Sequence, residues 1–142
     1  MDKNTFEHEQ FSTTPHVTRV EKPWGYELHW ATKETYVGKV LHLNAGKRYS
    51  LQYHDAKRES QMLIKGKALL WADDEDGNYG AVDMQPFTGY DIVPYQRHRI
   101  EALEDTDIVE VSTPEIGTTY RLEDDAHRTD ETEEVRSRPG RV

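Results

Sequence analysis

Residues 46–66 read GKRYSLQYHDAKRESQMLIKG, and they carry a glutamine, a histidine and a glutamate at a spacing that predicts a metal site. Side chains alternate between the two faces of a β-strand, so Gln52 and His54 share one face while Tyr53 points the other way. Four residues separate His54 from Glu59, enough for the chain to turn and return as an antiparallel strand. Such a turn would bring Glu59 opposite Gln52 and His54.

A fourth candidate ligand, His98, lies in a second strand-and-turn segment, VPYQRHRIEA, at residues 93–102. Two imidazoles, one carboxylate and one amide oxygen form a suitable set for a divalent transition metal. The predicted ligands are therefore Gln52, His54, Glu59 and His98. Because an amide oxygen is a weak neutral ligand, the metal stays open among Mn, Fe, Co, Ni and Zn.

The rest of the chain predicts an all-β domain. Residues 18–32 contain apolar side chains in period two, which favours one half-buried strand, at Val20, Trp24, Tyr26, Leu28 and Trp30. Further short strands are expected within residues 35–46, 48–54, 59–66, 67–73, 81–87, 90–94, 98–103, 107–114 and 118–123. An Asp-Gly pair within residues 73–80 indicates a hairpin loop. No long segment has a helical period, so a β-sandwich or barrel is expected.

The chain has 142 residues, no cysteine and a formal net charge of −9. We expect a flexible N-terminal arm at residues 1–16, one barrel at residues 17–124 and a flexible charged tail at residues 125–142. The negative charge argues against nucleic acid or an anionic membrane as a partner, because both attract clustered Lys and Arg. No signal-peptide run or membrane-spanning stretch is found, so a cytoplasmic location is expected.

The motif spacing resembles that of the cupin superfamily. The first cupin motif is a Gly, five residues, His, one residue, His, three or four residues, Glu, six residues and Gly. Here Gly46, His54, Glu59 and Gly66 are in register, and Gln52 replaces the first His. The resemblance covers roughly residues 19–124. It implies the cupin, or RmlC-like, jelly-roll double-stranded β-barrel.

Within the cupins, the chain resembles the type II mannose-6-phosphate (phosphomannose) isomerases. The shared pieces are KPWGYE at 22–27, YVGKVL at 36–41, SLQ at 50–52, HRI at 98–100, EVS at 110–112 and RLED at 121–124. This resemblance implies an aldose–ketose isomerase of a sugar or sugar phosphate. The chain departs from the family at Lys57, at Ala102 and at residues 126–128, where another substrate preference would arise.

Four charged residues are candidates for the same cavity. Arg99 and Lys39 are the expected catalytic residues because they match the family's HR pair and y-x-x-K pattern. On a regular strand, however, Arg99 and His98 point to opposite faces, and Lys39 could face either inward or outward. Arg48 shares parity with Gln52 and could bind an anion. Glu110 could line the cavity, so Arg48 and Glu110 are the expected substrate-binding residues.

Three functions stay open at this stage. An isomerase needs a Lewis acid to polarise the carbonyl and a base to move a proton, and the sequence identifies no base. Two histidines and one carboxylate also suit a mononuclear iron oxygenase. A third alternative is a sugar-binding cupin without turnover. We also expect a homodimer, formed through exposed strand edges and the KPWG region at residues 22–25.

Overall fold

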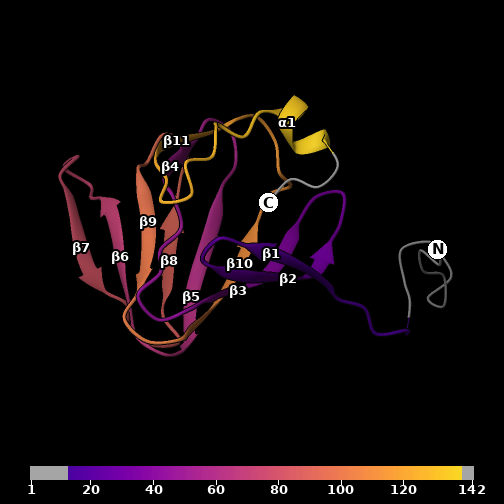
Figure 1. Ribbon diagram of the computed structural model, residues 1–142, viewed down its shortest axis with the longest axis horizontal. Coiled ribbons are helices and arrows are strands. Elements are labelled where there is room, and N and C mark those ends of the chain that lie inside the picture. The colour runs from indigo at the N-terminus through magenta and orange to yellow at the C-terminus, as the bar shows by residue number, and fades with distance from the viewer. Residues whose placement is uncertain (1–12, 139–142) are drawn as a thin grey trace, which may run out of the picture.

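The computed structural model describes residues 13–138, which form two antiparallel β-sheets packed against each other (Figure 1). The elements in chain order are β1 (Thr18–Lys22), β2 (Gly25–Thr32), β3 (Val37–Leu43), β4 (Leu51–His54), β5 (Glu59–Lys65), β6 (Ala68–Asp73), β7 (Tyr79–Asp83), β8 (Gly89–Ile92), β9 (His98–Ala102), β10 (Thr106–Ser112), β11 (Thr119–Glu123) and α1 (Glu133–Ser137). Within the described chain, no helix is long and apolar enough to cross a membrane.

One sheet has the strand order β1-β2-β3-β10-β5-β8 and the other has the order β11-β4-β9-β6-β7. The chain therefore crosses repeatedly between the sheets, and β10 lies between β3 and β5 although it follows them by many residues. The jelly-roll β-barrel predicted from the sequence is confirmed.

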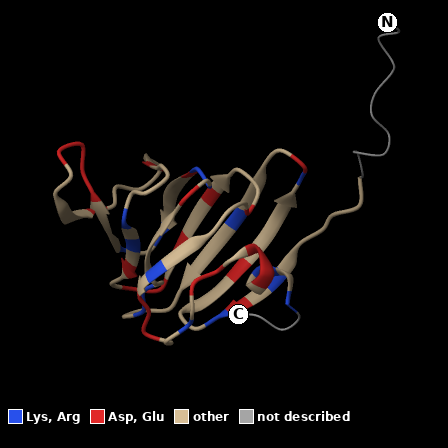
Figure 2. Cartoon of the chain, turned by 90° about the horizontal axis from the view of Figure 1, so that it is seen from above, with Lys and Arg blue, Asp and Glu red and all other residues tan. Residues whose placement is uncertain are grey.

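The inward side chains change from apolar at one end of the barrel to charged at the other. The apolar end forms the core and includes the almost fully buried Leu43, Leu63, Ile92, Ile100 and Ile108. Along β5, the inward residues that precede Leu63 are Glu59 and Gln61, and β3 and β10 likewise bury Lys39 and Glu110. Figure 2 shows acidic and basic residues close together on neighbouring strands of the barrel. The strands thus build a packed floor below a polar cavity.

Residues 18–32 form two strands, not the single strand expected. Lys22 pairs with Gly25, so Pro23 and Trp24 form a two-residue hairpin turn between β1 and β2. The turn changes which residues face inward, so the predicted apolar stripe on β2 points outward and Trp30 is 42% exposed. Trp24 is buried in the chain's own core, although the KPWG region was expected to contact a second copy.

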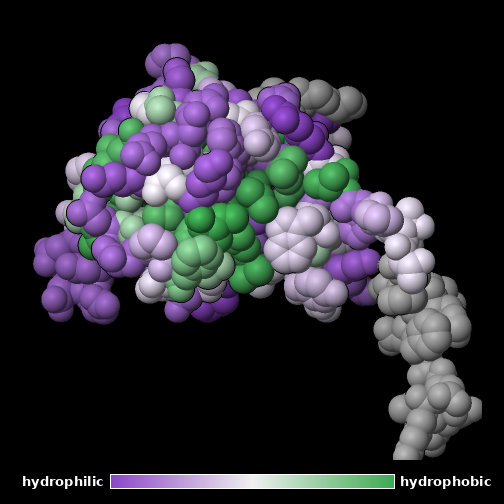
Figure 3. Space-filling model, turned by 90° about the horizontal axis from the view of Figure 1, so that it is seen from below, coloured by the Kyte–Doolittle hydropathy of each residue, from purple (hydrophilic) through white to green (hydrophobic). Residues whose placement is uncertain are grey.

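The outer face of the six-stranded sheet carries a row of apolar residues. Leu28, Val40, Val109 and Met62 lie opposite one another on β2, β3, β10 and β5. A continuous hydrophobic area is visible on the side of the molecule drawn in Figure 3.

The segment after β11 packs against the barrel, whereas its charged sequence predicts a flexible tail from residue 125. Glu131 forms a β-bridge with Thr119, and α1 begins directly afterwards with Thr132 as its N-cap. Ion pairs and backbone hydrogen bonds hold the segment against the barrel. Because these contacts do not require apolar side chains, the low hydropathy of the segment did not predict its packing. Most of the predicted N-terminal arm, residues 1–12, lies outside the described residues.

Two motif glycines allow a test of the local backbone. Both have a positive φ, +80° at Gly46 and +94° at Gly66, which costs an L-residue about 1–2 kcal/mol. A Cβ at Gly66 would also collide with the carbonyl oxygen of Asp105, whereas a Cβ at Gly46 would meet nothing within 4 Å. Urea unfolding should therefore show a loss of about 1–2 kcal/mol for Gly46→Ala and about 2–5 kcal/mol for Gly66→Ala. Equal losses would contradict the crowding at Gly66.

Candidate metal centre and its pocket

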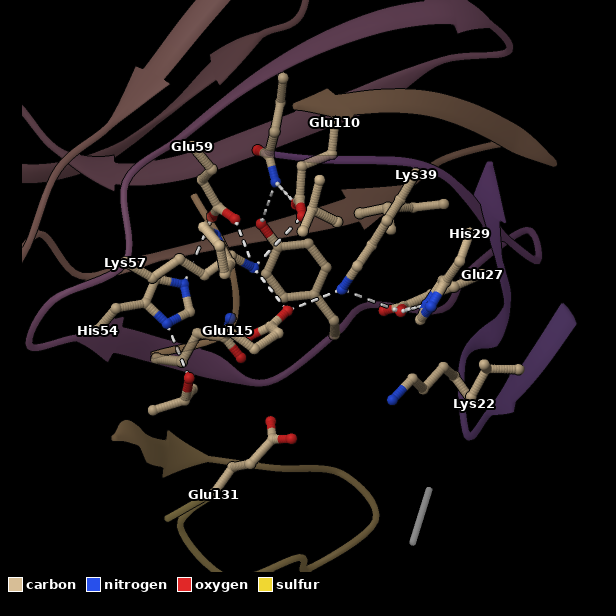
Figure 4. Close-up of a pocket in the computed structure, with 18 of the residues that line it drawn as sticks. Lys22, Glu27, His29, Lys39, His54, Lys57, Glu59, Glu110, Glu115 and Glu131 are labelled. Carbon is tan, nitrogen blue, oxygen red and sulfur yellow. Dashed lines mark hydrogen bonds and ion pairs between the residues drawn. The ribbon is translucent and has the colours of Figure 1, made fainter. Parts of the chain in front are cut away.

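A cavity of about 430 Å³ opens at the charged end of the barrel. Its walls come from both sheets and from the segment after β11 (Figure 4). The ionisable side chains that face it include Lys22, Glu27, Lys39, His54, Lys57, Glu59, Glu110, Glu115 and Glu131.

The structure brings together three of the four predicted metal ligands. His54 ends β4, Glu59 begins β5 and His98 begins β9. Their ligand atoms all lie within 4.8 Å of one another, and all three residues are buried. Oε1 of Glu59 is 3.1 Å from Nε2 of His98 and 3.5 Å from Nε2 of His54.

The hydrogen bonds of the two histidines fit a metal ion. Nδ1 of His98 donates to the carbonyl oxygen of Gln96 at 2.9 Å, and Nδ1 of His54 lies 2.8 Å from the hydroxyl of Thr119. Both Nε2 atoms are buried without a hydrogen-bond partner. Burial lowers the pKa of His54, which favours the neutral ring that binds metals. Two orphaned ring nitrogens beside one carboxylate therefore suit a divalent cation.

Gln52 faces the same cavity and lies opposite His98 in the β4–β9 pair. Its Oε1 atom accepts a hydrogen bond from the hydroxyl of Ser50 at 2.6 Å. Gln52 is thus next to the three ligands, and its own coordination of a metal stays a prediction.

Lys57 is the central cation of the pocket, whereas the sequence indicated only a turn position at which the chain departs from the isomerase family. Its Nζ atom lies 3.1 Å from Glu59, 3.3 Å from Glu110 and 3.1 Å from Glu115. Burial lowers its pKa, but the surrounding carboxylates raise it well above its ordinary value. Lys57 is therefore a charged ammonium with 5% exposure, held between three carboxylates.

Lys39 points inward, which decides between the two orientations that the sequence left open. Its Nζ atom lies 2.8 Å from Glu115 and 3.4 Å from Glu27. Burial and the charge of Lys57 lower the pKa of Lys39, but Glu27 and Glu115 raise it above its ordinary value. Glu115 thus bridges Lys39 and Lys57, and the ion pairs extend from the triad to the far wall.

The carboxylate of the triad is in the form that binds metal. Burial raises the pKa of Glu59, but Lys57 and the two histidines lower it well below the ordinary value. Burial likewise raises the pKa of Glu115, and Lys57 and Lys39 lower it well below the ordinary value. Glu59 is therefore an ionised oxygen donor beside the two ring nitrogens, as a divalent cation requires.

Glu110 faces the cavity from β10, as the sequence predicts for a cavity-lining residue. Its carboxylate accepts hydrogen bonds from Gln61 at 3.1 Å and from Lys57 at 3.3 Å. Burial, together with the charge of Glu59, raises the pKa of Glu110 to about 7. Glu110 is thus a buried carboxyl group beside the predicted metal ligands.

Arg99 and Arg48 lie outside the cavity. Arg99 follows His98 on β9 and points to the opposite face, where its Nε atom donates to the carbonyl oxygen of Tyr49 at 3.0 Å. Arg48 forms two hydrogen bonds of 2.9 Å with Asp125. Arg48 was expected to share a face with Gln52, but it does not. Tyr49 and Gln52 both line the cavity, so the alternation of faces is interrupted between them. Of the four charged candidates, Lys39 and Glu110 therefore line the pocket, whereas Arg99, expected to be catalytic, and Arg48, expected to bind substrate, do not.

Several lining residues were missed by the sequence reasoning: Glu27, His29, Tyr49, Gln61, Glu115 and Glu131. Glu27 and His29 lie two residues apart on β2 and therefore share one face. Recognising a hairpin turn at Pro23 in the sequence would have predicted that this face points inward. Glu131 gave no signal, because its segment has no strand alternation.

The environment of Glu27 predicts an acid-dependent loss of stability. Burial raises its pKa, but Lys39, His29 and Lys22 lower it to about 2, from 4.5. The stabilisation is present above pH 4.5 and is lost as the pH falls toward 2. Between about pH 6 and pH 3, wild type should lose about 2 kcal/mol more than Glu27→Gln in urea unfolding. Equal losses would contradict this ion-pair environment.

Comparisons with known proteins identify the fold. No family model and no curated protein matches the sequence. Among solved structures, the chain is similar to the capsular polysaccharide assembling protein CapF from Staphylococcus aureus, with 17% identity, a TM-score of 0.57, and 89% of this chain and 34% of CapF covered. The chain is also similar to KdgF from Halomonas sp., with 13% identity and a TM-score of 0.58. This match covers 78% of this chain and 94% of KdgF.

A third similar structure is oxalate decarboxylase from Bacillus subtilis, a protein with Mn(II) centres. It is 21% identical to this chain, and the match has a TM-score of 0.59 and covers 76% of this chain. The chain spans about a third of the length of the CapF and oxalate decarboxylase chains. These neighbours are cupin-fold proteins. At such low identity they establish the architecture alone, and the chain has the cupin fold.

Proposed function

We propose that this chain is a metal-dependent enzyme that acts on a sugar or sugar phosphate, and that it catalyses aldose–ketose isomerisation. The observation that carries the proposal is the pair of orphaned Nε2 atoms of His54 and His98, which face Glu59 at the base of a polar cavity. The cavity of about 430 Å³ lies in the range that holds small molecules.

The residues divide into ligands and groups that act on the substrate. His54, Glu59 and His98 would hold the metal, with Gln52 as the predicted fourth ligand. A bound divalent metal supplies a Lewis acid for the substrate's carbonyl and hydroxyl oxygens. Glu110 is our candidate for moving a proton between adjacent carbon atoms, because its carboxylate faces the cavity beside the ligands.

Lys39 and Lys57 would balance negative charge that develops on the substrate. Both ammonium groups are already engaged by carboxylates, and Arg128 at the pocket wall is paired with Asp124. A phosphate group would have to compete with these carboxylates for a cation. An unphosphorylated sugar is therefore the substrate that we rank first.

A mononuclear iron oxygenase is the second candidate. Two histidines and one carboxylate leave coordination positions for a substrate and oxygen, and this ligand set is the one found in the described residues. The buried acid and base groups around the ligands favour proton transfer, so the isomerase ranks ahead.

Replacing His54 should test the metal and the activity together. Elemental analysis of wild type, purified without a metal-affinity tag, should give about one divalent metal ion per chain. His54→Ala should contain only traces of metal and lose aldose–ketose exchange, because one buried ligand is missing. Retained turnover in metal-free His54→Ala would end the proposal.

His42 provides the matched control. It lies on the outer face of β3, where Nδ1 is 2.6 Å from Asp107, and His42→Ala should keep its metal. Iron with oxygen consumption in the wild type would favour the oxygenase instead. Absence of metal after reconstitution would favour a sugar-binding protein without turnover.

The homodimer stays a prediction of the sequence. Light scattering of the purified protein at micromolar concentration measures it directly.

A further inference from the structure

The C-terminal segment at residues 129–137 covers the free edge of β11. The amides of Glu131 and Thr119 each donate to the other's carbonyl oxygen at 2.9 Å. The carboxylate of Asp130 accepts a hydrogen bond from the amide of Arg121 at 2.9 Å. Since β11 is an edge strand of its sheet, these bonds satisfy backbone groups that would otherwise be unpaired.

Thr119 connects this edge to the predicted metal ligand His54. The two residues lie opposite each other in β11 and β4, and the Thr119 hydroxyl is 2.8 Å from Nδ1 of His54. A partner on the second ring nitrogen fixes the tautomer and the direction of a ligating imidazole. The segment therefore contacts Thr119, and Thr119 in turn contacts His54.

Arg136 of α1 makes the second connection. Its guanidinium donates to the carbonyl oxygens of Glu115 at 3.4 Å and of Gly117 at 3.2 Å, both in the loop between β10 and β11. The Glu115 side chain reaches inward to Lys39 and Lys57. The helix thus holds, from outside, the loop whose carboxylate forms part of the pocket wall.

We propose that residues 129–137 position the metal centre and the adjoining pocket wall, so that a segment outside the barrel strands sets the metal affinity. The positioning residues are Arg136 in the segment and Thr119 on β11, with which the segment pairs. The same segment presents Glu131 to the cavity, where its carboxylate faces the space beside Lys22 (Figure 4). The inference rests on the proposed function only in requiring that the triad binds a divalent metal.

The test measures binding of Co²⁺ alone, by competition with a chelator and by the visible absorption spectrum of the bound ion. Thr119→Val removes the hydroxyl at nearly constant volume and should weaken Co²⁺ binding by about 10–100-fold, with a changed spectrum. Thr119→Ser keeps a hydroxyl and should restore both. Arg136→Gln should weaken binding by about tenfold, at the lower end of such effects.

Arg138→Gln is the matched control, because the Arg138 guanidinium pairs with Glu134 within the exposed end of α1. This variant should bind Co²⁺ like wild type. Wild-type affinity and spectrum in Arg136→Gln would overturn the inference even if Thr119→Val binds Co²⁺ more weakly, because Thr119 belongs to β11 and contacts His54 directly. The proposed function would remain intact. Failure of wild type to bind Co²⁺ would overturn both.

Discussion

Replacing Glu110 with glutamine is expected to lower kcat for aldose–ketose exchange by about 10²–10⁴-fold, the usual contribution of a general acid or base. The amide keeps the size of the side chain and can still interact with Gln61, but it cannot carry a proton. Metal content should be unchanged, because Glu110 is not one of the three clustered ligands. Steady-state kinetics of the metal-loaded variant, with elemental analysis of the same sample, provide the measurement.

Glu101→Gln is the control for this experiment. Glu101 accepts a hydrogen bond from the Trp71 indole on the outer face of β9, and a glutamine can accept the same bond. Its kcat should equal that of wild type. Full activity of Glu110→Gln would remove Glu110 from the mechanism and leave the proton transfer to another group in the cavity.

Lys57→Met should produce the largest loss of stability. Removing the ammonium leaves Glu59, Glu110 and Glu115 without their shared partner, and breaking a buried ion pair from one side costs about 3–5 kcal/mol. Urea unfolding of the metal-free protein at neutral pH gives the value. A bound divalent metal should reduce the loss, since its charge replaces part of the missing one.

The exposed Lys65, at the end of β5, offers the comparison. Lys65→Met should change the free energy of unfolding by less than about 0.5 kcal/mol, as is usual for surface positions. A loss below about 1 kcal/mol in Lys57→Met would mean that its carboxylates take up protons or water readily. The buried charge network would then contribute little to stability.

The approach of His54 and Glu59 could be predicted from the sequence because it depends on local geometry. Regular alternation fixes the face of His54, and the turn to Glu59 is short. His98 begins the distant strand β9, so its expected place came from the second strand-and-turn segment and not from local periodicity. Alternation also puts Arg99 on the face opposite His98, and the structure agrees, so the catalytic role expected for Arg99 from the family's HR pair is not supported.

The remainder of the pocket could not be predicted, because single irregularities reverse or interrupt the alternation. The hairpin at Pro23 moved Glu27 inward and Leu28 outward. The break between Tyr49 and Gln52 moved Arg48 away from the cavity. The placement of Glu131 depends on backbone pairing with a strand distant in sequence, which has no local signature.

The two sides of the cavity are built from different parts of the chain. Its metal side is built from β4, β5 and β9, deep in the paired sheets, while Lys22 and Glu131 come from segments near the two ends of the described chain. During divergence, substitutions in these outer segments can alter which molecule is accepted without disturbing the reactive centre. A mutant library for new specificities would accordingly randomise Lys22 and Glu131 and keep β4, β5 and β9 constant.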